Sequence, residues 1–241
     1  MDKEKVDIKD FTLVLPVLNE SQNLKRLLRE IRNILYLNDL NILVIDDNSD
    51  DKFESEKITK NYGAKYFLRY SKNTLSGSII DSISKINTKY LIVMDSDLQH
   101  DPNNIFEMIK YVNSENSDLV IGYRDIKKIS FNFTYKRILI STLGIHIANS
   151  VLHKKFKDPL TGFFLINRFF LNKISHKLHY GGSKILFNIL IFSSKIKVSE
   201  LLINFRPRIH HSSKFKINWF YHFLKVFFIG FLYRLSKLLR K

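Results

Sequence analysis

Short apolar runs alternate with stretches of helical periodicity in the first half of the chain, and this alternation restricts the fold more than any other feature. Strands that alternate with helices indicate βαβ units and a mostly parallel sheet. We therefore expect an α/β fold. The expected strands are 11–15, 41–45, 64–68, 90–94 and 118–121, and the expected helices are 20–37, 79–86 and one that opens at Asp101-Pro102. The second half is less regular, with helices expected over 135–152 and 183–193 and strands within 158–167 and over 198–205.

Polar and acidic side chains follow three of the expected strands. They occur in the segments 16–20, 46–49 and 95–97, which read Pro-Val-Leu-Asn-Glu, Asp-Asp-Asn-Ser and Asp-Ser-Asp. Ligands of open parallel sheets bind outside the carboxyl ends of the strands. A binding site is therefore expected where these three segments meet.

Asp95 and Asp97 are two carboxylates, two residues apart, at the end of an apolar strand. Both can reach one hard divalent cation, and Mg²⁺ or Mn²⁺ would be held there by the carboxylates and by diphosphate oxygens. Such a cation neutralises the charge that grows on a departing nucleoside diphosphate. The alternative is a hydrated turn whose aspartates cap a helix.

Charge is distributed unevenly along the chain. Residues 1–125 hold 21 acidic and 17 basic side chains, whereas residues 126–241 hold 22 basic side chains and only two acidic ones, Asp158 and Glu200. The second half is expected to face an anionic partner, for which a nucleic acid and an anionic membrane are both suitable. The absence of cysteine excludes disulfides, thiolate catalysis and cysteine-bound zinc. The charged start of the chain lacks the apolar segment of a secretory signal.

Four motifs occur in order, at 16–20, 44–49, 75–77 and 94–102, with the sequences PVLNE, VIDDNS, LSG and MDSDLQHDP. Together they resemble the family 2 glycosyltransferases, and most closely the dolichol-phosphate mannose synthase-like branch. The resemblance covers roughly residues 11–214. It implies a GT-A type fold, a nucleotide-sugar donor such as GDP-mannose or UDP-glucose, and inversion at the anomeric carbon.

The resemblance also implies roles in the nucleotide-sugar half, residues 1–125. Asp46 or Asp47 would accept a hydrogen bond from the base. Asp95 and Asp97 would bind metal and diphosphate, with Gln99 as a third metal ligand. The other positions expected at the nucleotide-sugar are Pro16, Asn19, Glu20 and Ser76.

The resemblance continues past residue 120 and through the acceptor half, residues 126–214. Segment 118–124 is similar to a family strand that ends in arginine, here Arg124. Segment 157–163 is similar to the family pattern D-x-T-S-G-F, and segment 206–214 is similar to the pattern R-x-x-G-x-S-K. Two residues depart from these patterns, Thr161 in place of serine and His211 in place of glycine.

A phosphate monoester acceptor needs no catalytic base, because its oxygens are already ionised near pH 7. It needs cations that hold it in line with the anomeric carbon. The residues expected to form this cradle are Arg124, Arg137, Ser141, Arg208 and Lys214. Asp97, Arg124 and Arg137 are the expected catalytic residues. Asp158 is the candidate base if one is needed, and otherwise a structural residue of its turn.

Segment 215–241 is expected to form an amphipathic helix at a membrane surface. One helical face of 217–239 is apolar, and the stretch also contains Lys225 and Arg234. The expected apolar face consists of Phe220, Leu224, Phe227, Phe231, Leu235 and Leu238. Aromatic anchors with a basic rim are typical of interfacial helices. A helix packed on the domain's own core or on a partner subunit is the alternative.

The expected activity is transfer of a sugar from a nucleotide-sugar to a polyprenyl phosphate at the cytoplasmic face of a membrane, by a peripheral protein. The sequence is compatible with a homo-oligomer and with a separate membrane-anchor subunit. One alternative is a family 2 enzyme that glycosylates a sugar hydroxyl of a surface polysaccharide. Another is a non-catalytic RNA-binding module, although the sequence lacks the RNP-like, KH and zinc signatures of such modules and we expect no nucleic-acid partner.

Overall fold

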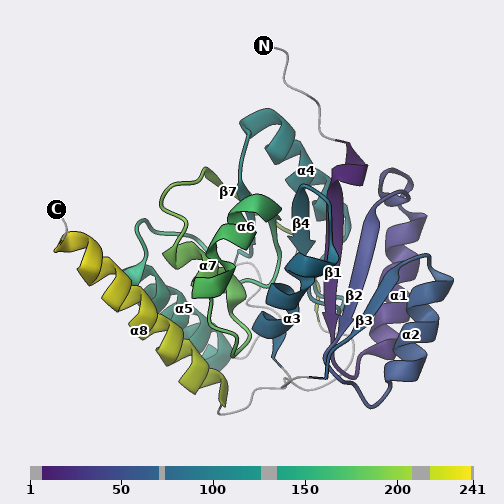
Figure 1. Ribbon diagram of the computed structural model, residues 1–241, viewed down its shortest axis with the longest axis horizontal. Coiled ribbons are helices and arrows are strands. Elements are labelled where there is room, and N and C mark those ends of the chain that lie inside the picture. Colours follow the sequence, from purple (N-terminus) through teal and green to yellow (C-terminus); the bar gives the residue numbers. More distant parts are fainter. Residues whose placement is uncertain (1–6, 71–73, 126–134, 208–217, 240–241) are drawn as a thin grey trace.

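The structure, a computed structural model, describes residues 7–70, 74–125, 135–207 and 218–239 (Figure 1). Seven strands form one sheet in the order β3-β2-β1-β4-β6-β5-β7. The strands are β1 (Phe11–Val17), β2 (Asn41–Asp46), β3 (Lys65–Leu68), β4 (Tyr90–Val93), β5 (Leu119–Tyr123), β6 (Phe164–Asn167) and β7 (Val198–Leu202). β6 is antiparallel to β4 and β5, and the other neighbours are parallel. The predicted α/β class and mostly parallel sheet are confirmed.

Helices cover both faces of this sheet (Figure 1). One apolar core includes side chains from α1 (Ser21–Asn33), α2 (Lys52–Asn61) and α4 (Asn103–Glu115). The other core includes side chains from α3 (Leu75–Ser82), α5 (Tyr135–Val151), α6 (Arg168–Ile174), α7 (Ile185–Ile191) and α8 (Asn218–Leu238). The sheet is therefore buried on both faces, as its continuous apolar strands require.

Several boundaries differ from the sequence-based expectation. The helix expected over 20–37 ends at Asn33 and is followed by a 3₁₀ turn, Leu35–Leu37. The expected helix 79–86 begins earlier, at Leu75, where the side chain of Thr74 accepts a hydrogen bond from the backbone N–H of Gly77. At α4 the N-cap position is Pro102, one residue later than predicted, but the Asp101 carboxylate still accepts from the backbone N–H of Asn103.

The C-terminal helix α8 lies beside α5 and α7, away from α1 and α2 (Figure 1). Phe223 and Val226 are buried there, and the rings of Phe223 and Phe187 lie 5.6 Å apart. A Cβ atom at Gly230 would lie 3.0 Å from Val151, so glycine permits the close approach of α8 to α5. The predicted helix is confirmed. Its most buried residues, Phe223, Val226 and Gly230, do not belong to the predicted apolar face, of which Phe227 also packs against the core.

Much of the predicted apolar face of α8 is exposed. Phe220, Phe231, Leu235 and Leu238 are 55%, 50%, 43% and 63% exposed. Within the described part of the chain, no helix combines the length and the apolar character needed to cross a bilayer. The proposed domain boundary at residue 214 lies outside the described residues and stays a prediction.

Candidate active site

The loop after β4 carries the two aspartates of the predicted metal site. Ser96 donates from Oγ to the carbonyl oxygen of Pro16, 3.1 Å away, which ties this loop to β1. Leu98 has a φ of 66°, and the backbone N–H of Gln99 donates to Asp97 Oδ1 at 3.2 Å. A left-handed backbone is costly for a branched apolar residue, so the surrounding contacts hold this loop in a strained shape. Asp95 and Asp97 are thereby fixed at the carboxyl end of β4.

Burial of Asp95 raises the pKa of its carboxyl group, and the neighbouring Asp97 raises it further. The positive charges of Lys184 and Arg124, together with His100, oppose this rise. Two such carboxylates side by side fit a hard cation, which would remove their mutual repulsion. Within the described residues no three His, Cys, Asp or Glu side chains cluster as a metal site, so ligand oxygens would complete the coordination.

Gln99 and His100 are buried behind these aspartates. The Gln99 side-chain amide donates to the carbonyl oxygen of Arg206, 3.4 Å away, and its role as a metal ligand stays a prediction. His100 stacks on Phe163 at 5.1 Å and meets the edge of Phe205 at 5.4 Å. The two residues thus connect the metal loop to segment 205–206.

Gly162 contacts Asp95 so closely that a Cβ atom there would lie 2.4 Å from Asp95 Oδ2. Alanine at position 162 is expected to displace the Asp95 carboxylate and to reduce sugar transfer about 100-fold, because catalytic groups tolerate little misplacement. Turnover of the variant would be measured beside its thermal midpoint. Gly144→Ala in α5 is the control, and equal activity of the two variants would contradict the expectation.

Arg124 follows β5 and forms an ion pair with Asp158, its Nε lying 2.7 Å from Asp158 Oδ2. Asp158 is fully buried, and the guanidinium of Arg124 also lies over the ring of Phe205. The negative charges of Asp158, Asp95 and Asp97 raise the pKa of Arg124 against the effect of its burial. Asp158 is therefore engaged in holding Arg124, which favours the structural interpretation of this residue over the catalytic base.

Segment 205–207, which precedes the predicted Arg208 and Lys214, is fastened to the metal loop. The Arg206 guanidinium pairs with Glu30 at 2.7 Å and with Asp101 at 2.9 Å, and its backbone N–H donates to the carbonyl oxygen of Gln99. Arg208 and Lys214 themselves lie outside the described residues. Arg137 lies in the first turn of α5, and Ser141 follows one turn later on the same helix. The arrangement of all four around a phosphate stays a prediction.

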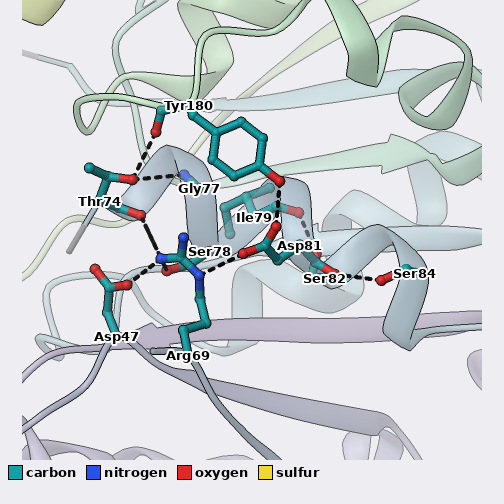
Figure 2. A network of polar contacts seen from close by, with 10 residues as sticks. All are labelled: Asp47, Arg69, Thr74, Gly77, Ser78, Ile79, Asp81, Ser82, Ser84 and Tyr180. Carbon is teal, nitrogen blue, oxygen red and sulfur yellow. Dashed lines mark hydrogen bonds and ion pairs between the residues drawn. The ribbon is translucent and has the colours of Figure 1, made fainter. Parts of the chain in front are cut away.

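Asp46 and Asp47 have different environments. Fully buried Asp46 accepts from the Ser49 backbone N–H at 2.7 Å through Oδ1 and from the Tyr66 hydroxyl at 2.9 Å through Oδ2. Asp47 instead forms an ion pair with the guanidinium of Arg69 (Figure 2). Burial raises the pKa of Asp47, and Arg69 opposes the rise. Asp46 thus shapes the turn after β2, whereas Asp47 is held by Arg69; that either of them meets a base stays a prediction.

The other predicted donor residues lie at the same ends of β1 and β2. Asn19 has a φ of 54° and exchanges hydrogen bonds with Ser49 and Asp50, joining the two loops. Pro16 is buried within β1, and the Glu20 carboxylate accepts from the side-chain amide of Asn23 at 2.6 Å. The structure therefore brings these residues together at the predicted edge of the sheet.

Arg69 is the centre of a network that the motifs did not indicate (Figure 2). Besides Asp47, the buried guanidinium contacts Asp81 at 2.7 Å and the Ser78 hydroxyl at 3.1 Å. Asp81 accepts from the hydroxyl of Tyr180. Arg69 directly follows the end of β3, so the rule that located the aspartates at strand ends would also have selected it.

Predicted Ser76 is buried at the start of α3, and its backbone N–H donates to the carbonyl oxygen of Gly182, 3.0 Å away. Thr74 donates from its hydroxyl to the carbonyl oxygen of Tyr180 at 2.8 Å. The segment 180–182 is thereby fastened to the start of α3, beside the Arg69 network.

A concavity of about 1120 Å³ lies away from these groups. Its lining includes Lys9, Asn41 and Lys89, which lie at the opposite ends of the strands from Asp46 and Asp95. The predicted site lies instead at the carboxyl ends of the strands, where charged side chains converge.

Comparisons with known proteins identify the family of the chain. The model of the family "Glycosyl transferase family 2" matches residues 12–175. A dolichol-phosphate mannosyltransferase of Pyrococcus furiosus is 32% identical over 94% of this chain, and the chain spans 63% of that protein's length. A dolichol-phosphate mannosyltransferase of Mycosarcoma maydis is 24% identical, over 84% of this chain and 72% of that protein.

The fold is also found in solved structures. Glucosyl-3-phosphoglycerate synthase of Mycobacterium tuberculosis, crystallised with Mn²⁺, UDP and glucosyl-3-phosphoglycerate, superposes with a TM-score of 0.65 at 15% identity. The superposition covers 93% of this chain and 79% of that one. The GT-A fold and the family expected from the four motifs are confirmed: the chain belongs to glycosyl transferase family 2.

Proposed function

We propose that this protein transfers a sugar from a nucleotide-sugar to a polyprenyl phosphate at a membrane surface. The observation that carries the proposal is the convergence of Asp95 and Asp97 with the Arg124–Asp158 pair. Asp95 and Asp97 suit a metal-bound diphosphate, and Arg124 suits a phosphate acceptor. The similarity to two dolichol-phosphate mannosyltransferases supports the same substrate class.

The donor would lie across the ends of β1, β2 and β4, with its base towards Asp47 and its diphosphate towards Asp95 and Asp97. Mg²⁺ or Mn²⁺ bound by these two aspartates would supply the positive charge that stabilises the departing diphosphate. Burial raises the pKa of Asp95, so a bound cation would stabilise the ionised form of this carboxylate.

The proposed acceptor chemistry follows from the ion pair between Asp158 and Arg124. An oxygen of the lipid phosphate would attack the anomeric carbon while the bond from that carbon to the diphosphate oxygen breaks, and the electron pair departs with the nucleoside diphosphate. No proton has to be removed from an ionised phosphate. A site in which Asp158 already pairs with Arg124 suits that reaction, and Arg124 would orient the phosphate together with Arg137, Ser141, Arg208 and Lys214.

The surface of α5 and α8 supports the membrane part of the proposal. Leu139, Ile140 and Leu143 of α5 are more than half exposed, as are Phe228 and Leu232 of α8. Residues 126–241 also carry an excess of basic side chains, 22 against two acidic ones, whereas residues 1–125 are net negative. Apolar side chains combined with basic ones bind anionic bilayers. Three further points stay predictions: that the protein acts at the cytoplasmic face, that it forms a homo-oligomer, and that it binds an anchor subunit.

The Phe228→Ser/Leu232→Ser double variant is expected to bind anionic vesicles at least about tenfold more weakly, because two exposed apolar side chains lose their bilayer contact. Vesicle co-sedimentation measures the change. The matched control is Leu35→Ser, since Leu35 is 88% exposed and follows α1, at the end of the sheet away from α8. Equal vesicle binding by wild type and the double variant would contradict the membrane role of α8.

A donor panel tests the proposed activity. Purified protein with Mn²⁺ or Mg²⁺ and a short-chain polyprenyl phosphate receives GDP-mannose, UDP-glucose or UDP-N-acetylglucosamine in turn, and the glycosyl-phospholipid is measured by mass. We expect a product from one donor that Asp97→Ala does not form. Protein that binds a nucleoside diphosphate but gives no lipid product from any donor would refute the proposed acceptor.

A further inference from the structure

Two histidines face each other where the C-terminal helix meets the rest of the domain. His179 lies in the segment that precedes α7, and His222 lies near the start of α8. His179 Nε2 and His222 Nδ1 are 3.1 Å apart, so one neutral imidazole donates a hydrogen bond to the other. The pair belongs neither to the predicted motifs nor to the candidate active site.

Two glycines bring the backbone of this segment against His222. A Cβ atom at Gly181 would lie 2.3 Å from His222 Nδ1 and 2.7 Å from His179 Nε2. A Cβ atom at Gly182 would lie 2.8 Å from the Cβ of His222. The two imidazoles are therefore held in contact, and they have little room to move apart while α8 stays docked.

Segment 179–182 is fixed on its other side to α3. The backbone N–H of Ser76 donates to the carbonyl oxygen of Gly182, 3.0 Å away, and the Tyr180 hydroxyl donates to Asp81. These contacts do not involve α8. A repulsion between the two rings would therefore displace the start of α8 rather than the segment.

The surroundings of the pair disfavour positive charge. Burial lowers the pKa of His179, and Lys225 of α8 and the neighbouring His222 lower it further. The other titratable side chains on the segment and on the first turns of α3 and α8 beside it are Tyr180, Lys184, Asp81 and Tyr221. Asp81, the carboxylate of this set, already pairs with Arg69 at 2.7 Å. A charged imidazole thus gains little compensation here.

We propose that the His179–His222 pair is a pH-sensitive latch, which holds the start of α8 on segment 179–182 and releases it when both imidazoles are protonated. A single proton can be shared, because a charged ring donates to a neutral one, but a second proton leaves two N–H groups facing each other without an acceptor. The docked form then binds protons less tightly than the released form. Docking is therefore favoured above the ordinary histidine pKa of about 6.5 and weakens as pH falls below it. Since α8 is the helix proposed to meet the membrane, its attachment to the domain would depend on pH, but the latch does not require that proposal.

Trp219 gives a readout of the latch, because it is the only tryptophan of the chain and lies in the first turn of α8. Tryptophan fluorescence of the full chain would be followed from about pH 8 to about pH 5, across the range in which histidine titrates. Wild type should show a sigmoidal change with its midpoint below about 6.5. His179→Gln, whose amide stays neutral, should reduce the amplitude at least about fivefold. The control His176→Gln, at an exposed histidine three residues away, should titrate as wild type does.

Hydrogen exchange separates release of the helix from a change in the environment of the tryptophan alone. The backbone amides of residues 222–225 donate to the first turn of α8, as in any α-helix. Their exchange, corrected for its intrinsic pH dependence, should become at least about tenfold faster in wild type on the acid side of the transition, but not in His179→Gln. Unchanged exchange in wild type, or the same acid transition in wild type and His179→Gln, would overturn the latch.

Discussion

Replacement of Asp97 by asparagine is expected to reduce sugar transfer about 100- to 1,000-fold while leaving the protein folded. Asparagine keeps the shape of the side chain but removes the charge that would hold a divalent cation against the diphosphate. Asp97 is partly exposed, so its charge is not needed to stabilise the core. Steady-state turnover and the affinity for Mn²⁺ would be measured together, because both should fall.

The control for this substitution is Asp39→Asn. Asp39 is an exposed carboxylate that borders the concavity at the opposite edge of the sheet. It should retain wild-type turnover and Mn²⁺ affinity. An Asp97→Asn variant with unchanged turnover would show that the transfer does not depend on this carboxylate.

Replacement of Arg69 by methionine is expected to cost about 3–5 kcal/mol of unfolding free energy. Methionine leaves two carboxylates, Asp47 and Asp81, without the buried cation that pairs with them. Urea unfolding measures the loss. Lys60→Met is the control, because Lys60 forms an exposed pair with Glu56 on α2 and should change stability by less than about 1 kcal/mol.

The same substitution should make stability depend on pH in a defined direction. Burial raises the pKa of Asp47 even with Arg69 present, and loss of the guanidinium would raise it further. The folded variant would then bind a proton more tightly than the unfolded chain, so the destabilisation should grow as pH rises through the carboxylate range. Adding Asp47→Asn to Arg69→Met should recover part of the stability. Equal losses for Arg69→Met and Lys60→Met would contradict the role assigned to this network.

The sequence predicted the strands well and two helices not at all. Each strand of the first half is a compact apolar run, so its position was clear. Helix α2 was missed because its buried face includes Ser55 and Thr59, which carry no apolar periodicity. Helix α6 was missed because it is short and follows β6 directly, with Asn167 as both strand residue and helix cap. The antiparallel insertion of β6 between β4 and β5 depends on tertiary pairing, which no local pattern reveals.

The candidate site was predictable where it depends on strand ends and less so where it depends on packing. Asp95 and Asp97 follow β4, and Arg124 follows β5 on the other side of β6; the two aspartates lie near enough to Arg124 to raise its pKa. Arg69 was missed because it belongs to no recognised motif, although it directly follows a strand; its contacts with Asp47 and Asp81 appear only in the fold. Likewise, α8 buries Phe223, Val226 and Gly230, and the close approach of Gly230 to Val151 and Ile191 depends on packing that helical periodicity does not show.

The central claim, that the acceptor is a lipid phosphate, is tested most directly by a comparison of acceptors. With the donor that gives turnover, the protein would receive polyprenyl phosphate, the same polyprenol without phosphate, or an oligosaccharide, and each glycosylated product would be measured by mass. We predict a glycosyl-phospholipid from the first acceptor only, since the site offers cations for a phosphate and pairs Asp158 with Arg124. Efficient glycosylation of the oligosaccharide, with no product from polyprenyl phosphate, would contradict the account.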